Sequence, residues 1–460
     1  MSNTPSEKDV QPGAAPASGE GLVEAVTEAL EDADRERLVS LVEDLPAPDT
    51  ADLIELLEPD ERIHLIQSLG PDFDYEALSE LDETVRDQVS EALPNEILAK
   101  AVTELDTDDA AYVLEGLGES DKEEILAQLA TSDRAALERN LDYPEETAGR
   151  LMQADFVAVA PYWNVGQVID YMRETEDLPE TFSEIFVVDP AHRVLGAVDL
   201  SRLLRTKRHV PVESIMETEL HLVLATADQE DVARQFERYN LISAPVVDET
   251  NRLVGVITVD DVVDVIQDEA EEDMKKLAGV GDESLADTVL ATARSRVPWL
   301  VVNLGTAILA SFVIKLFDAT IEEMVALAVL MPIVASLGGN AGTQTMTVTV
   351  RALATSKLGA ANTGRVITRE ALVGLCNGLV LSAIMASVVF VWFGSGKLGA
   401  VIGLAMIVNL LAAGLAGILI PLTMDRLDLD PAPASGVFVT MVTDCVGFFA
   451  FLGLASQWLA

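Results

Sequence analysis

Two polar interruptions of apolar segments are the features of this sequence with the greatest capacity for chemistry. Asp444 lies in the middle of the apolar run 436–460, and Asn340 and Gln344 interrupt a second apolar run, 331–350. A carboxylate at the centre of a membrane helix costs ~2.5–3.5 kcal/mol on insertion scales, so such residues usually line an ion or substrate path. Together the two interruptions predict a hydrophilic pore that crosses a membrane.

A second group of acidic residues recurs at helical spacing before the apolar segments. Asp261 and Asp264 are three residues apart, and Glu269 is followed by Glu272 and Asp273 at three and four residues. Residues at these spacings share one face of a helix. Like charges on one face repel each other and divalent cations relieve that repulsion, so the spacing predicts cation binding. A solvated acidic helix without a ligand is the alternative.

Charge divides the chain into two parts. Of its 30 basic and 77 acidic residues, only 7 basic and 8 acidic residues lie from Val297 onward, which leaves a net charge of −46 on residues 1–296. The first part is therefore expected in water and the second in a membrane. Such acidity argues against nucleic acid or anionic lipid surfaces as partners of the soluble part and favours cations. A saline habitat is the alternative explanation. Cys376 and Cys445 lie in apolar segments, so no disulfide framework is predicted.

The soluble part begins with a tail and a helical domain. Residues 1–20 are rich in Pro, Ser, Ala and Gly and are predicted to be disordered. No basic stretch precedes an apolar run there, so we expect no cleaved signal and a cytoplasmic N-terminus. In residues 21–150, Leu and Ile recur at helical spacing, and Asp or Ser stands at expected helix starts with an acid three residues on. This pattern predicts a superhelix of paired short helices with acidic exposed faces.

Residues 151–267 contain an internal repeat of strand and helix signals. The segment SEIFVVDPAHRVLGAVDLSRLL matches ISAPVVDETNRLVGVITVDDVV, which aligns Asp189 with Asp248 and Gly196 with Gly255. The repeated pattern, VVD followed by VLG or LVG, resembles a tandem pair of CBS domains, small α/β modules that usually sense adenosine nucleotides or ions. Two unrelated βαβ units are the alternative.

The remainder comprises a connector, residues 268–296, predicted to form a connecting helix, and a membrane domain, residues 297–460. Five apolar segments are each long enough to span the ~30 Å hydrocarbon core. They are Val297–Phe317, Met324–Val350, Val366–Phe393, Leu398–Met424 and Ala434–Leu459. Arg and Lys before the first span and in the second loop predict the N-terminus inside and the C-terminus outside.

This organisation resembles the MgtE family of magnesium channels over nearly the whole chain. The most specific motifs are GGNAGTQTMTVTVRALAT, residues 338–355, and DPAPASGVFVTMVTDCVG, residues 430–447. The resemblance implies a multidomain membrane protein with an α-helical superhelix N-domain, tandem α/β CBS domains, a connecting (plug) helix and a five-helix transmembrane domain. It also implies a homodimer whose ion path lies between the subunits and is lined by the second and fifth spans.

The resemblance places Asp444 and Asn340 in the ion path and Asp430 near the pore mouth, where an ordinary helix cap is the alternative role. Two Asp444 carboxylates across a two-fold axis would repel each other until a divalent cation neutralised them. Gly338 and Gly342 would either permit non-helical turns lining a cavity or serve close helix packing. Gly436 stands where some relatives have Asn.

The resemblance further implies that cytosolic Mg²⁺ closes the pore by binding acidic residues between the soluble domains and the connecting helix. The corresponding residues are Asp108, Asp228, Glu230, Asp261, Asp264, Glu269, Glu272 and Asp273. Two departures are Asn240, where a relative has Asp, and Tyr112, which replaces an acid that would pair with Asp108. ATP is a further ligand that the CBS cleft could hold, near Pro245, Asp248 and Thr258, although the sequence has no phosphate-binding glycine loop.

We therefore expect a homodimeric, multi-pass inner-membrane channel that admits Mg²⁺ and is closed by cytosolic Mg²⁺. It is not expected to be an enzyme, because no Walker loop and no placed nucleophile–base pair occur in the sequence. One alternative is a channel of broader selectivity that also admits Mn²⁺, Co²⁺ or Ni²⁺. Another is a membrane-anchored metal sensor whose spans only dimerise the soluble part.

Overall fold

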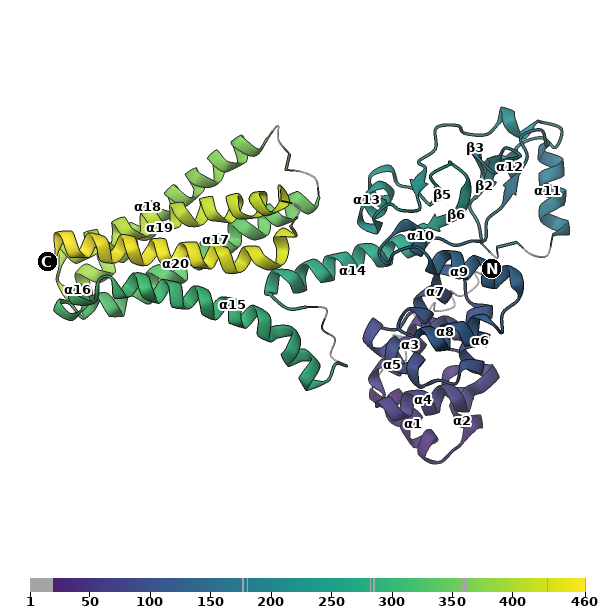
Figure 1. The fold of residues 1–460 in the computed structure, drawn as a ribbon, viewed down its shortest axis with the longest axis horizontal. Helices are drawn as coiled ribbons and strands as arrows, with labels where there is room; N and C mark the ends of the chain where they lie inside the picture. Colours follow the sequence, from purple (N-terminus) through teal and green to yellow (C-terminus); the bar gives the residue numbers. More distant parts are fainter. Residues whose placement is uncertain are drawn as a thin grey trace, which may run out of the picture. The chain divides into compact units, whose positions relative to one another are not determined.

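The computed structural model describes residues 20–459 except 176, 177, 180, 282, 284, 285, 356, 357, 360, 361 and 428. The predicted disordered tail, 1–20, lies outside the described residues apart from Glu20. The chain divides into two compact units, Met1–Gln267 and Asp268–Ala460, and each is described by itself (Figure 1).

The first unit begins with short helices, as the sequence predicts. Local capping explains where several of them start: the side chains of Asp34 and Asp82 accept the backbone N–H groups of Arg37 and Thr84 at 3.1 and 3.0 Å. The elements are α1(Glu20–Glu31), α2(Arg35–Val42), α3(Ala47–Leu56), α4(Pro59–Leu69), η1(Gly70–Asp72), η2(Tyr75–Leu78), α5(Glu83–Ala92), α6(Asn95–Glu104), α7(Thr107–Glu115), α8(Glu119–Leu126), α9(Thr131–Leu141) and α10(Ala148–Leu151).

Two three-stranded sheets follow, which confirms the predicted tandem modules. In each sheet the first strand is parallel to the second and the second is antiparallel to the third. Val187 pairs with Gly196 in one sheet and Val246 with Gly255 in the other. The elements are β1(Ala158–Val159), α11(Val165–Glu174), β2(Glu184–Val188), β3(Val194–Asp199), α12(Leu200–Arg205), η3(Val212–Ser214), β4(Val223–Leu224), α13(Gln229–Tyr239), β5(Ser243–Val247), β6(Leu253–Thr258) and α14(Val259–Ala278).

The segment that precedes each module packs into the other module. Met152 belongs to the apolar core of the second module, and Met216 packs against the core of the first. Backbone hydrogen bonds accompany the exchange, because Gln153 both donates to and accepts from Val256, at 2.8 and 3.0 Å. Each module therefore completes its core with residues from outside its own sheet.

We predict that Gly255→Ala destabilises the first unit. An added Cβ would lie 2.7 Å from both the Gln153 carbonyl oxygen and the Met152 sulfur, and overpacking of this kind typically costs about 1–3 kcal/mol. Calorimetry of the full-length protein should show a lower thermal midpoint for the soluble transition. Gly118→Ala is the control, because its nearest atom would lie at 3.7 Å. Equal midpoints for the two variants would contradict the prediction.

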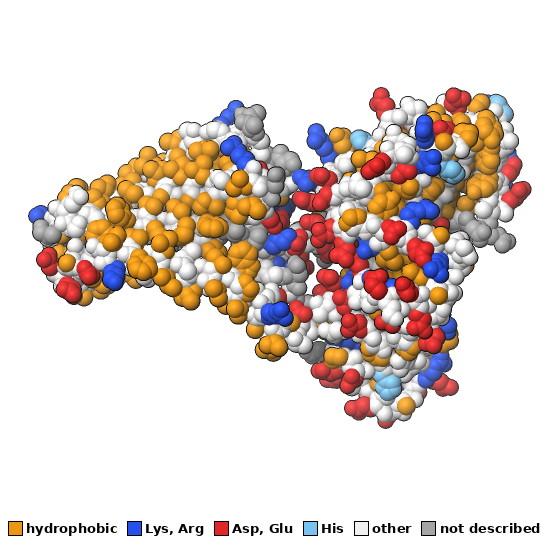
Figure 2. All heavy atoms as spheres, viewed as in Figure 1, with side chains coloured by type: hydrophobic (Ala, Val, Ile, Leu, Met, Phe, Trp, Pro, Cys, Tyr) orange, Lys and Arg blue, Asp and Glu red, His pale blue; other side chains and the backbone are white. Residues whose placement is uncertain are grey.

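The second unit contains the five predicted membrane spans, all helical and all long and apolar enough to cross a membrane. Apolar side chains cover most of the face of these helices that Figure 2 shows. α19 is the most buried of the five and packs against α17, α18 and α20, whereas α15 is the most exposed. The helices are α15(Val289–Lys315), α16(Asp318–Glu323), α17(Ala326–Ala354), α18(Thr363–Phe393), α19(Gly396–Asp425) and α20(Pro431–Trp458).

Two details differ from the sequence expectations. The connector 268–296 is not one helix: α14 starts at Val259 and ends before Gly279, whose φ of 72° suits a glycine beyond a helix end, and α15 starts at Val289. The expected non-helical turns around Gly338 and Gly342 are also wrong, because α17 is helical throughout. A Cβ at either glycine would lie within 2.5 Å of a neighbouring helix's side chain, so close helix packing explains both.

Candidate functional site

One face of α17 is polar and left uncovered by the rest of the chain. Asn340, Thr343, Gln344 and Thr347 are all exposed, and their spacing of three, four and seven residues puts them on one side of the helix. Hydrocarbon offers such groups no hydrogen bonds, so polar residues in a spanning helix face water, a partner or a ligand. This polar face is the first component of the candidate site.

α20 supplies the second component. Thr440 is exposed and Asp444, one turn later, is half-buried. α17 and α20 run antiparallel, because a Cβ on Gly436 would lie 3.9 Å from Met346 and a Cβ on Gly342 would lie 2.4 Å from Val439. Beyond this contact, Gly338 of α17 and Gly447 of α20 both lie against the Asn409 amide, at 2.2 and 2.7 Å from an added Cβ. Asn340 and Asp444 lie between these two contacts on their helices and are therefore at about the same level.

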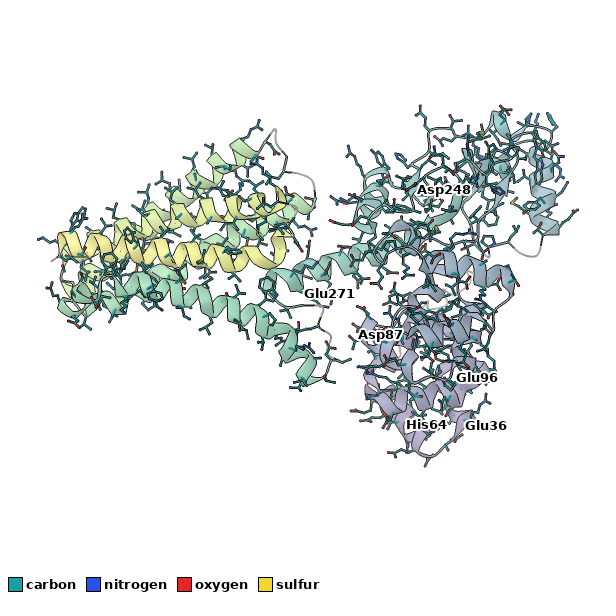
Figure 3. All side chains as sticks on the ribbon, in the orientation of Figure 1. Glu36, His64, Asp87, Glu96, Asp248 and Glu271 are labelled. Carbon is teal, nitrogen blue, oxygen red and sulfur yellow. The ribbon has the colours of Figure 1, made fainter. Side chains whose placement is uncertain are left out.

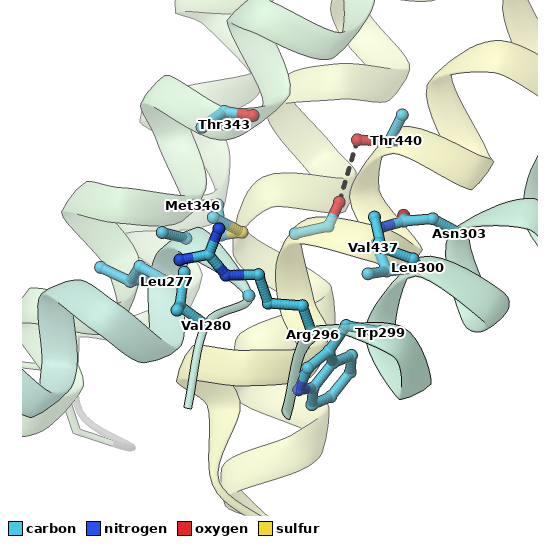
Figure 4. A pocket seen from close by; sticks show the side chains of 13 residues that line it. Leu277, Val280, Arg296, Trp299, Leu300, Asn303, Thr343, Met346, Val437 and Thr440 are labelled. Atoms are coloured by element: carbon cyan, nitrogen blue, oxygen red, sulfur yellow. Dashed lines mark hydrogen bonds between the residues drawn. The ribbon is translucent and has the colours of Figure 1, made fainter. Parts of the chain in front are cut away.

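A cavity lies below this level, on the side where α20 starts. It has a volume of about 480 Å³, and its lining includes Thr343 of α17, Thr440 and Gly436 of α20, and Arg296 of α15 (Figure 4). The Thr440 hydroxyl donates to the Gly436 carbonyl at 3.0 Å, which leaves its oxygen lone pairs available. The cavity therefore continues the polar faces of α17 and α20.

The end of α14 also lines this cavity, through Leu277 and Ala278. Leu277 packs against an apolar cluster in which α17 provides Met346 and Val350 and α20 provides Ala432 and Val439. The end of α14 thus contacts both α17 and α20, the helices that carry the polar faces.

Charged residues gather where α14 meets the start of α20. Asp430 caps α20 by accepting the Ala432 N–H at 2.8 Å, and its carboxylate lies 3.5 Å from Lys276 Nζ. Lys276 also pairs with Glu272. Burial and then the Asp430 carboxylate raise the pKa of Asp273. Asp430 is therefore a helix cap that also faces the acids of α14.

A second acidic group lies inside the first unit, between α7 and α14. Asp108 is 8% exposed, and its Oδ1 has no hydrogen-bond partner in the described part of the chain. Burial and then the Asp261 carboxylate raise the pKa of Asp108 well above its usual range, and raise that of Asp109 to about 7. Burial also raises the pKa of Asp261 to about 6, although the Thr258 hydroxyl donates to it at 2.5 Å.

The neighbours of this group are also acidic. Burial and the Asp260 carboxylate raise the pKa of Asp264, and burial and the Asp264 carboxylate raise that of Glu80. Tyr112, the departure noted in the sequence, stacks on the Arg86 guanidinium at 3.9 Å instead of adding a further charge. The group therefore holds unbalanced negative charge in a poorly solvated place.

The remaining sequence-predicted acids lie elsewhere. Asp228 caps α13 by accepting the Glu230 N–H at 2.9 Å, and Glu230 pairs with Arg234 at 3.3 Å, both within the first unit. Glu269 lies on the part of α14 that belongs to the second unit. Over the described residues, no three His, Cys, Asp or Glu side chains are arranged to hold a metal ion. Mg²⁺ usually keeps several waters and needs only one or two carboxylates.

The residues expected at a nucleotide cleft have structural partners. Asp248, labelled in Figure 3, accepts hydrogen bonds from the backbone N–H groups of Thr250 and Arg252 at 2.8 and 2.9 Å. These hydrogen bonds lower the pKa of Asp248, and the one from Arg252 contributes most. The Thr258 hydroxyl donates a hydrogen bond to Asp261, and Pro245 is buried in β5. Asp248 holds the turn between β5 and β6, as Asp189 holds the equivalent turn between β2 and β3.

Two polar residues of the membrane domain were not singled out from the sequence. Glu370 of α18 is largely buried and accepts the Thr345 hydroxyl at 3.3 Å. Asn409 of α19 is 1% exposed. Both interrupt apolar segments, so the signal that identified Asp444 was available for them as well.

We predict that Asp108→Asn raises the thermal midpoint of the first unit by a few degrees in EDTA. The substitution keeps the shape of the side chain and removes its repulsion with Asp261, which is strong because the pair is buried. Calorimetry of the full-length protein measures the effect. The control is Glu96→Gln at an exposed helix position, which should leave the midpoint unchanged (Figure 3). A lower midpoint for Asp108→Asn would refute the repulsion.

Comparisons with known proteins match all parts of the chain to proteins of one kind. A family described as "Divalent cation transporter" matches residues 331–454, an "MgtE intracellular N domain" matches 45–146, and CBS domains match 148–209 and 212–268. The chain is 33% identical to a protein named "Magnesium transporter MgtE" from Thermus thermophilus, over 95% of this chain and 98% of that one. It is 36% identical to a protein of the same name from Enterococcus faecalis, over 69% and 70%.

A solved structure resembles the soluble part. The "cytosolic domain of the Mg2+ channel MgtE in complex with ATP" is 32% identical and covers 53% of this chain and 99% of its own, with a TM-score of 0.49. The identity to the Thermus protein holds over nearly the full length of both chains, from the helical domain to the last membrane helix. This chain is a multi-pass membrane protein that belongs to the MgtE family of divalent cation transporters.

Proposed function

We propose that this protein is a homodimeric channel that admits Mg²⁺ through the inner membrane, with its N-terminus in the cytoplasm. Relatives named magnesium transporters and the match to an intracellular N domain support this proposal. The observation that carries it is the pair of Asn340 and Asp444, at one level on the uncovered polar faces of α17 and α20. The protein is a transporter, not an enzyme.

A second copy would cover the polar faces and complete the ion path. Two Asp444 carboxylates brought near a two-fold axis repel each other strongly where the dielectric constant is low. One divalent cation between them cancels their formal charge. Because Mg²⁺ gives up its waters reluctantly, the Asn340 amide and the hydroxyls of Thr343 and Thr440 are suited to bind those waters. The cavity of about 480 Å³ would be the cytoplasmic entrance to this path.

Closure by cytosolic Mg²⁺ is the second part of the proposal. The end of α14 packs against α17 and α20 through Leu277, so a displacement of α14 reaches both pore-lining helices. The start of the same helix carries Asp261 and Asp264, which face Asp108, Asp109 and Glu80. Cytosolic Mg²⁺ bound among these acids would relieve their repulsion and hold α14 in the closed position. Loss of the cation would release it.

The remaining acids of the predicted gate belong to the same proposal. Glu272, Asp273 and Asp430 meet at the junction of α14 and α20, with Lys276 among them. Asp228, Glu230 and Glu269 are proposed as further ligands from the family resemblance alone. ATP bound to the CBS pair also stays a prediction, which equilibrium dialysis of the protein with ATP would test.

Broader selectivity is the main alternative. The family description names divalent cations in general, and Gly436 leaves the pore mouth without the amide that some relatives have. If Mn²⁺, Co²⁺ or Ni²⁺ competes with Mg²⁺ entry into proteoliposomes, the channel has broader selectivity. If none of them competes, the channel is selective for Mg²⁺. A folded dimer without any flux would leave only the membrane-anchored sensor, although a simple anchor has no use for uncovered polar groups.

We predict that Asp444→Asn abolishes Mg²⁺ entry into proteoliposomes. The substitution preserves shape but removes the charge that attracts a partly dehydrated cation. Mg²⁺ entry is followed with a trapped fluorescent indicator, and growth of a strain lacking other magnesium uptake gives a second measurement. Asp425→Asn, the same change at the exposed end of α19, is the matched control and should transport normally. Flux equal to wild type in Asp444→Asn would exclude Asp444 from the path.

We also predict that Asp261→Asn combined with Asp264→Asn keeps the channel open at high cytosolic Mg²⁺. The two changes remove carboxylates that are proposed to bind Mg²⁺, so the cation can no longer hold α14 in the closed position. Patch-clamp recording of membranes with Mg²⁺ titrated on the cytoplasmic side measures closure. Glu249→Gln, at an exposed turn, serves as the control. If the double variant closes at the same Mg²⁺ concentration as wild type, this gate assignment is wrong.

A further inference from the structure

Asn409 occupies an unusual position at the centre of the membrane domain. It lies on α19, is 1% exposed, and donates from Nδ2 to the Val334 carbonyl of α17 at 2.9 Å. Its Oδ1 is buried and has no hydrogen-bond partner among the described residues. A leucine of similar size would fill this place without burying an unpaired oxygen. The polar side chain must therefore do something other than fill space.

The Asn409 amide fits into a gap made by two glycines on two different helices. A Cβ on Gly338 of α17 would lie 2.2 Å from Nδ2, and a Cβ on Gly447 of α20 would lie 2.7 Å from the same atom. Any larger residue at either position would collide with the amide. One side chain of α19 thus interlocks with both helices that carry the polar faces.

The interlock fixes which way each helix faces. On α17, Asn340 follows Gly338 by two residues, or ~200° of rotation, so burying Gly338 against Asn409 turns Asn340 to the opposite, uncovered side. On α20, Asp444 precedes Gly447 by three residues, so it lies ~60° away around the helix and ~4.5 Å along its axis. This agrees with the exposed Asn340 and the half-buried Asp444 of the structure.

We propose that Asn409 is a positioning residue for ion selection: its amide sets the rotation of α17 and α20 and thereby aims Asn340 and Asp444 into the path. The inference rests on the proposed function. A buried asparagine plays a comparable part in coiled coils, where it lowers stability and in return fixes the alignment of the helices. Apolar packing alone resists a small rotation poorly, because neighbouring methyl groups are interchangeable, whereas the amide has one acceptor and two fitted glycines.

The test compares Asn409→Leu with wild type in proteoliposomes, measuring Mg²⁺ and Co²⁺ entry separately. Asn409→Leu should purify as a folded protein of at least wild-type thermal stability, since it removes an unpaired buried oxygen. The ratio of Mg²⁺ to Co²⁺ entry should fall by about tenfold, because displacing a functional group by ~1 Å can cost a factor of this order or more. Val408→Leu, at the neighbouring exposed position, is the control and should keep the wild-type ratio.

A merely structural role would lower both fluxes together and leave their ratio unchanged, and that result would overturn the inference. A second comparison remains decisive if Asn409→Leu does not fold. Gly338→Ala should alter the ratio by pushing the amide aside, whereas adding Gly338→Ala to Asn409→Ala should change it no further. Independent effects of the two substitutions would contradict the interlock. Wild-type protein without Mg²⁺ entry would instead overturn the proposed function, and the inference with it.

Discussion

Polar groups that lie among membrane-spanning helices must be matched by other polar groups, because hydrocarbon supplies none. In this chain the matching takes two forms. Asn409 is buried and finds one acceptor on α17, whereas Asn340 and Asp444 lie on faces that the single chain does not cover. The first form joins helices within one subunit. The second leaves polar groups that, in the proposed function, a second subunit and a hydrated cation between the two copies would match.

Buried carboxyl groups in the soluble part likewise need polar or charged partners. Asp108, Asp109 and Asp261 are shielded from water and make no ion pair with a basic residue in the described part of the chain. Burial, with the neighbouring carboxylates, raises their pKa values. Arg86 lies in the same helical domain, but its ion pairs are with Glu83, Asp87 and Glu115. Carboxyl groups without a basic partner are thus gathered between α7 and the start of α14, where the proposed gating cation would bind.

Much of this organisation could be predicted from the sequence, because its signals are local. Hydropathy located the five membrane helices to within a few residues at most ends, with α15 starting eight residues earlier than predicted. The two copies of the VVD pattern located both sheets, because Asp189 and Asp248 make the same turn in each. The resemblance to a family supplied the set of candidate acids, whose roles are still predictions.

What could not be predicted depends on contacts between distant segments. Nothing in the sequence near Gly338 indicates that Asn409, on another helix, fills the space above it. Gly279 resembled any other glycine, yet its positive φ divides the predicted connecting helix. Nothing in the sequence around Met152 or Met216 indicates that each packs in the opposite module.

That exchange of segments has a consequence for biosynthesis. Met152 and Gln153 leave the ribosome about a hundred residues before β6, against which they pack, so this segment waits for the second module to be made. At about 5–20 residues per second, the delay is on the order of ten seconds. During this interval an apolar edge is accessible to chaperones and to neighbouring nascent chains. The paired modules are therefore expected to complete their folding in one late step, and deletion of either module is expected to leave the core of the other incomplete.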